Sequence, residues 1–197
     1  TTRLAHLAGL LHDIGKIGIP GSILNKTERL TDDEFEEMKN HAVIGADILG
    51  EVDSYGEIST LVRHHHERID GAGYPDQIGG DFIPAISRMI SVADTYSAMT
   101  TDRPYRQGMP TEKAMAILGE ASGSGQLDEM YTAVFLRILR NADPLYQRGK
   151  QTSFEVEVAK HEALGEFEQR VLHDDVPTSV PDITIVVTDD EIQKDAA

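Results

Sequence analysis

The sequence predicts an all-α fold for residues 1–150, and three observations support this. Apolar residues recur at helical spacing in one segment after another. Helix-start signals precede several of these segments: Thr31 with Glu34 forms a capping-box pattern, and Pro84 suits a first helical position. No run of alternating β-type residues appears before residue 150. We therefore expect a helical bundle over residues 1–150, with residues 151–197 as an acidic C-terminal extension.

The first half of this region predicts three helices. One runs from Leu4 to about Asp13, where Gly15 ends it, and residues 17–29 read as a loop rich in glycine and proline. The capping box begins a helix through Asn40, and a further helix is expected from His41 to about residue 49. His41 is expected to open this helix, beside the small residues Ala42 and Gly45.

The second half predicts four more helices and one long loop. Helices are expected over residues 54–67, 84–101, 111–121 and 127–141. Residues 68–83 contain several glycines and a proline and form the loop. A loop of this length inside a compact domain is usually functional or disordered.

The C-terminal extension gives a less definite pattern. Thr152 with Glu155 is typical of a helix start, with the helix extending to about Leu172, although residues 154–158 alternate like a strand. Residues 183–188 are β-like, which fits either the first strand of an adjacent domain or a flexible end.

Composition and charge exclude several functions. The formal net charge is −16, which argues against general binding to DNA or RNA polymers or to an anionic membrane surface. Cysteine is absent, so disulfides and thiolate metal sites are excluded. No apolar run approaches the roughly 20 residues that span a bilayer, and a cytoplasmic location is expected.

Histidines and aspartates form the first group of candidate functional residues. Six of the eight histidines lie between His6 and His66. Asp94 sits in an apolar helical stretch among small neighbours, where an isolated buried carboxylate would be costly without a cation partner. The alternatives are ordinary polar pairs at helix ends and an aspartate bonded to serine hydroxyls.

Imidazole and carboxylate ligands suit Fe, Mn, Zn or Ni. Two pairs of adjacent residues, His12–Asp13 and His65–His66, are expected to lie in helices. The two side chains of each pair would then point about 100° apart around the helix axis. Such divergence serves a two-metal cluster better than one small ion.

Two further features suggest a phosphate or nucleotide ligand. The glycines in the loop that contains Gly73 and Tyr74 permit the backbone to approach a ligand closely, although an ordinary surface turn has the same composition. Arg103 and Arg106 are suited to bidentate phosphate binding, or alternatively compensate a helix C-terminus.

Taken together, these residues resemble the HD-GYP domain, a branch of the HD superfamily of metal-dependent phosphohydrolases. The resemblance covers roughly residues 4–140. The matching strings, in the family's order, are His12-Asp13-Ile14-Gly15-Lys16, His41, His65-His66-Glu67-Arg68-Ile69-Asp70-Gly71-Ala72-Gly73-Tyr74-Pro75, Val92-Ala93-Asp94 and Arg103-Pro104-Tyr105-Arg106.

The resemblance implies a helical HD-type domain that hydrolyses cyclic di-GMP, a bacterial second messenger, to pGpG and GMP. A metal-bridging hydroxide would attack phosphorus, and the metals would be two divalent ions, iron or manganese, with a third left open. Asp13 would bridge the metals and Lys16 would contact the scissile phosphate. Substrate would also meet Gly73, Tyr74, Arg103 and Arg106. The implied metal ligands are His12, Asp13, His41, His65, His66 and Asp94.

The chain departs from the family pattern in two places. Family members usually carry more helix before the His-Asp pair, so we expect a piece of a longer protein, fused or docked to a sensory or regulatory domain, and a homodimer is left open. Ser97 stands where an aspartate is common, which puts catalytic efficiency in question. His64 is expected to be structural.

Two alternative functions stay open. One is a weak or inactive metal-containing module that binds a cyclic dinucleotide, and the other is a phosphohydrolase for another cyclic dinucleotide.

Overall fold

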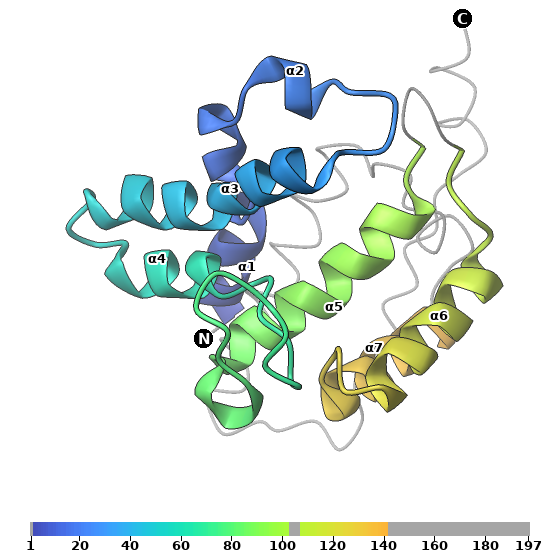
Figure 1. Ribbon diagram of the computed structural model, residues 1–197. Helices are drawn as coiled ribbons and strands as arrows, with labels where there is room; N and C mark the ends of the chain where they lie inside the picture. The colour runs from blue at the N-terminus through green and yellow to red at the C-terminus, as the bar shows by residue number, and fades with distance from the viewer. Residues whose placement is uncertain (1, 103–106, 142–197) are drawn as a thin grey trace, which may run out of the picture. The chain divides into compact units, whose positions relative to one another are not determined.

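The computed structural model describes residues 2–102 and 107–141, which form seven α-helices, two 3-10 helices and no strand (Figure 1). This confirms the all-α prediction for that part of the chain. None of the helices described is long and apolar enough to cross a bilayer. The predictions for Arg103, Arg106 and the extension over residues 151–197 concern positions outside the described residues. The elements are α1 (Thr2–Leu11), η1 (Ile14–Gly18), α2 (Gly21–Leu24), α3 (Asp32–Gly50), α4 (Gly56–Arg63), η2 (Gly80–Phe82), α5 (Ala85–Thr100), α6 (Thr111–Gly123) and α7 (Glu129–Asn141).

Helix α3 is one continuous helix where the sequence predicted two. It begins at the predicted capping box, in which the Glu34 amide donates to Thr31 Oγ1 at 3.3 Å and the Thr31 amide donates to Glu34 Oε2 at 2.7 Å. No glycine or proline follows before Gly45, so nothing interrupts the helix near Asn40. His41 therefore lies in the middle of a helix instead of at its start.

Helix α4 ends at Arg63, four residues earlier than predicted. The carbonyl of Val62 accepts a hydrogen bond of 2.5 Å from His65 Nδ1, so a side chain satisfies a free carbonyl of the last turn. His65 and His66 consequently lie in a turn, as do His12 and Asp13 after α1, and the helical placement of both pairs was wrong. The predicted loop at residues 17–29 also contains the short helix α2.

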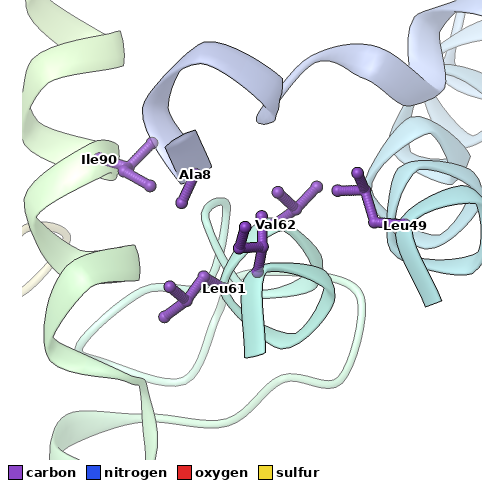
Figure 2. Close-up of a cluster of buried hydrophobic side chains, with 6 residues drawn as sticks. Ala8, Leu49, Leu61, Val62 and Ile90 are labelled. Atoms are coloured by element: carbon purple, nitrogen blue, oxygen red, sulfur yellow. The ribbon is translucent and has the colours of Figure 1, made fainter. Parts of the chain in front are cut away.

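Two hydrophobic clusters share helix α5. The first joins α1, α3, α4 and α5, and Figure 2 shows Ile90 of α5 facing Ala8 and Leu61. The second joins α5 to α6 and α7 through Val92 and Tyr96. Because α5 packs against helices on both sides, Asp94, which lies between these contacts, sits on a well-supported element.

Candidate metal centre

The six residues predicted as metal ligands come together from four segments of the chain. His12 and Asp13 lie in the turn after α1, His41 lies in α3, the pair at 65–66 lies after α4, and Asp94 lies in α5. The His65 ring centroid is 5.3 Å from those of His12 and His41 and 4.0 Å from that of His66. His12 Nε2 is 3.6 Å from Asp94 Oδ1. Residues up to 82 positions apart in sequence thus share one site.

Three of the histidines present the same ring nitrogen to the site. The Nδ1 atoms of His12, His41 and His65 donate to backbone carbonyls three residues earlier, at 2.7, 2.7 and 2.5 Å. In a neutral imidazole with a protonated Nδ1, Nε2 carries a lone pair and can bind a metal. These backbone bonds therefore fix the tautomer and aim Nε2 inward.

The Nε2 atoms face one another with no proton available to join them. His41 Nε2 and His65 Nε2 are 3.4 Å apart, and both rings already donate through Nδ1. His12 Nε2 is buried without a hydrogen-bond partner. Facing lone pairs are unfavourable unless a cation lies between or beside them, so the site fits a metal ion. His41, His65 and His66 place one ligand atom each within 4.8 Å of one another.

The ionisation of most of these groups also suits a cation. The exception is His12, where burial acts to lower the pKa but the contacts with Asp94, the Gly9 carbonyl and Asp13 together raise it. Burial lowers the pKa of His41, and it lowers the pKa of His65 to about 4, so both rings stay neutral near pH 7. Burial and the neighbouring His65 lower the pKa of His66 as well. Burial acts to raise the pKa of Asp94, but the contacts with His12, His66 and His65 together outweigh it and lower the pKa. Neutral imidazoles and ionised carboxylates are the forms that bind metals.

Asp13 faces the site with both carboxylate oxygens. Oδ1 is 3.6 Å from His41 Nε2, and Oδ2 is 3.5 Å from His12 Nε2. A carboxylate between two imidazoles is placed to contact two cations at once. Oδ2 also accepts from Lys16 Nζ at 2.5 Å, and the Lys16 side chain is 41% exposed, within reach of an anionic ligand.

Gly15 allows the segment that carries Asp13 to rest on α3. A Cβ at this position would lie 1.9 Å from the carbonyl oxygen of His41 and 2.4 Å from the amide nitrogen of Gly45. Any side chain here would push η1 away from α3. The backbone of Gly15 therefore packs directly against α3, which brings Asp13 to His41.

The long loop places Gly73 and Tyr74 against the histidines. The Tyr74 ring stacks on His66 at 4.8 Å with an interplanar angle of 29°, and the Tyr74 amide donates to the His66 carbonyl at 3.2 Å. A Cβ on Gly73 would lie 2.5 Å from Glu67 Cα. Close backbone approach, as predicted from the glycines, sets this loop at the border of the site.

Glu67 anchors the same loop, a role that the sequence analysis did not assign. The residue is 3% exposed, and Oε1 accepts from the Asp76 amide at 2.6 Å. Burial raises its pKa. An acidic residue directly after two candidate ligands was the available signal, but its burial depends on tertiary packing that the sequence does not display.

His64 has a different partner from the histidines beside it. Its Nε2 lies 2.9 Å from Asp76 Oδ2, and Arg63 holds the same carboxylate through two bonds of 2.7 Å. The group His41, His65 and His66 does not include His64, but it does not include His12, Asp13 or Asp94 either. The bond to Asp76 is therefore what distinguishes His64 from the candidate ligands.

His64→Ala should therefore keep the metal content of the wild-type protein, because its imidazole is engaged by Asp76. The matched variant His65→Ala should lose metal, since it removes an inward-facing Nε2. Elemental analysis of the two purified variants checks this, and loss of metal from His64→Ala alone would show that the assignment of ligands is wrong.

The structure adds less on two other features of the sequence, Ser97 and the arginine pair. Ser97 lies on α5 with Oγ 3.4 Å from Thr101 Oγ1, so its hydroxyl contacts the end of its own helix. Arg103 and Arg106 are outside the described residues. The flanking Met109 amide donates to the Met99 carbonyl at 2.9 Å, which returns the chain to the end of α5.

Comparison with known proteins adds independent findings. Residues 1–130 match the HD domain family. A cyclic di-GMP phosphodiesterase of Pseudomonas aeruginosa is 45% identical over 125 residues, covering 61% of this chain and 30% of the relative. One of Thermotoga maritima is 41% identical over 147 residues, covering 73% and 39%. A 3'3'-cGAMP-specific phosphodiesterase of Vibrio cholerae is 40% identical over 113 residues, covering 57% and 25%. The chain thus matches well under half the length of these relatives.

Proposed function

The chain belongs to the HD domain family, and we propose that it is the catalytic domain of a metal-dependent phosphodiesterase that hydrolyses cyclic di-GMP to pGpG or GMP. The observation that carries this proposal is the pair of inward Nε2 atoms, 3.4 Å apart, next to a carboxylate that faces two imidazoles. The names of the relatives support the choice of a cyclic dinucleotide as substrate.

The proposed cofactor is a pair of divalent ions, iron or manganese, with a third left open. Ions of this kind lower the pKa of water and stabilise charge on phosphoryl oxygens. Asp13 would face both ions. The residues proposed to hold them are His12, Asp13, His41, His65, His66 and Asp94.

The chain's own residues would bind and orient the substrate. Lys16 would place a positive charge beside the scissile phosphate, where preorganised charge is worth more than in water. Gly73 and Tyr74 would border the nucleotide, and Tyr74 is held in place by His66. Arg103 and Arg106 are proposed to bind phosphate or guanine.

At the level of the whole protein, we propose residues 1–150 as the catalytic domain and residues 151–197 as an extension. The domain would work in the cytoplasm, fused or docked to a sensory or regulatory partner.

The proposed function is tested by purifying the protein anaerobically with iron or manganese and following cyclic di-GMP by chromatography. We expect pGpG or GMP to accumulate in proportion to the metal content. A fully metallated protein that forms no product would contradict the enzymatic role.

A second candidate function, a binding module, is favoured by Ser97, whose hydroxyl stands three residues after Asp94 where the family commonly has a carboxylate. In that case the metal-loaded protein would bind cyclic di-GMP tightly and release no product. Competition between cyclic di-GMP and 3'3'-cGAMP in the same assay separates either role from a preference for the mixed dinucleotide.

Removal of the metal is expected to lower the thermal stability of the domain. The inward lone pairs of His41 and His65 then lack a cation, and a ligand at about 100 times its Kd stabilises the native state by about 2.7 kcal/mol. Thermal unfolding before and after treatment with a chelator measures the change, and added manganese should restore the original Tm. An unchanged Tm would indicate that no cation contributes to the folded state.

A further inference from the structure

A lysine on α3 lies beside Tyr74 at the border of the candidate metal centre, and an aromatic residue on the same helix lies beside that lysine. Phe35 is 47% exposed, and Lys39 lies one turn later on the same face of the helix. Lys39 Nζ is 5.0 Å from the Phe35 ring centroid and 5.7 Å from the Tyr74 centroid. Tyr74 in turn stacks on His66. Phe35 contacts Lys39, and Lys39 is connected to the candidate metal ligand His66 through the ring of Tyr74.

The exposed Phe35 ring suits stacking with a nucleobase. Phe35 belongs to neither hydrophobic cluster of the described residues, so packing in those clusters does not explain why an aromatic residue stands here. Stacking of a base on an aromatic side chain contributes substantially to nucleotide binding, and every base has a face that can stack. The Phe35 ring is partly exposed and has the Lys39 ammonium over its face, so it is placed to exchange that cation for the base that the phosphate carries.

Lys39 adds a hydrogen-bond donor beside that ring. Guanine offers two acceptors on one edge, O6 and N7, whereas adenine pairs its N7 with a donor. Glu36 Oε1 accepts from Lys39 Nζ at 2.6 Å and orients the ammonium group. The first turn of α3 is acidic, with Asp32, Asp33 and Glu34, which disfavours a phosphate at this place and favours a neutral base edge.

We propose that Phe35 and Lys39 form a guanine subsite for the cyclic dinucleotide. The base displaces the Lys39 ammonium from the face of Phe35, stacks there and accepts from Lys39 at its edge through O6 or N7, while the phosphate lies at the metal centre near Lys16. This inference rests on the proposed function, and it assigns to α3 a part of the substrate specificity.

The test compares wild type with Phe35→Ala and Lys39→Met. The readouts are metal content, affinity for a phosphorothioate analogue of cyclic di-GMP by calorimetry, and kcat and KM for cyclic di-GMP and for bis(4-nitrophenyl) phosphate, which has no nucleobase. Phe82→Ala is the matched control, because Phe82 is 85% exposed on η2 and has no ring contact with the histidines among the described residues.

Phe35→Ala should weaken affinity and raise KM for cyclic di-GMP about tenfold, in line with loss of one stacked base. Its kcat, its metal content and its hydrolysis of bis(4-nitrophenyl) phosphate should stay at wild-type values. Lys39→Met should lose more affinity for cyclic di-GMP than for cyclic di-AMP. Phe82→Ala should match wild type throughout.

The outcomes separate the subsite from the proposed function. If wild type binds cyclic di-GMP and Phe35→Ala binds it equally well, the subsite is wrong and the function stands. If Phe35→Ala loses metal or slows bis(4-nitrophenyl) phosphate as much as cyclic di-GMP, Phe35 has a structural role and the subsite is again wrong. If metal-loaded wild type neither binds nor hydrolyses a cyclic dinucleotide, the proposed function is wrong, and the subsite that rests on it is wrong as well.

Discussion

Asp13→Asn is expected to lose most of the bound metal and to reduce hydrolysis of cyclic di-GMP by more than about 100-fold. Loss of an outer hydrogen-bond partner of a metal ligand already costs roughly 10–100-fold, and Asp13 faces two imidazoles with its two oxygens. The amide has nearly the same shape but removes the negative charge that a pair of cations requires. Elemental analysis and the chromatographic assay on the same sample measure both effects.

Asp53→Asn is the control for this change, because it removes one negative charge from an exposed turn between α3 and α4. It should retain wild-type metal content and activity. If Asp13→Asn also retained both, the proposed position of Asp13 between two cations would be incorrect.

The second large effect is expected at Gly15. Gly15→Ala should destabilise the domain by about 3 kcal/mol, the upper end of the usual range for an overpacked core. The added methyl would lie 1.9 Å from the His41 carbonyl oxygen and 2.4 Å from the Gly45 amide nitrogen, both backbone atoms of a helix. Whatever folded protein remains should also bind metal poorly, since η1 must move away from α3 and carry Asp13 with it. Urea unfolding measures the stability.

Gly119→Ala is the control for this change, and it is expected to alter stability in the opposite direction. Gly119 lies inside α6, and a Cβ there meets no atom within 4 Å. Alanine in a helix interior is favoured over glycine by about 0.5–1 kcal/mol, so this variant should be slightly more stable than wild type. Equal effects of the two substitutions would show that the contact between Gly15 and α3 does not support the site.

Local signals in the sequence predicted much of the fold. The capping box at Thr31 predicted the start of α3, and Pro84, expected at the first helical position of α5, lies one residue before that helix. Such signals succeed because they act over a few residues. The continuous course of α3 through His41 and the early end of α4 were not predicted. The end of α4 depends on a side chain, His65, that bonds back to the helix. Such a bond has no pattern in the sequence.

The candidate site shows the same division. Residue types and order identified six residues that the structure brings together, including Asp94 from an apolar helix. The orientation of the rings could not be predicted, because it follows from carbonyls at Gly9, Met38 and Val62. Glu67 and Phe35 were given no role for a related reason. The burial of one and the exposure of the other are properties of the folded chain.

The most direct test of the central claim is the metal content of anaerobically prepared wild-type protein. Six proposed ligands that lie close together, with the Asp13 carboxylate between two imidazoles, predict two divalent ions per chain, which we propose to be iron or manganese. A folded protein that contains less than one divalent ion per chain after loading with iron or manganese would contradict the claim.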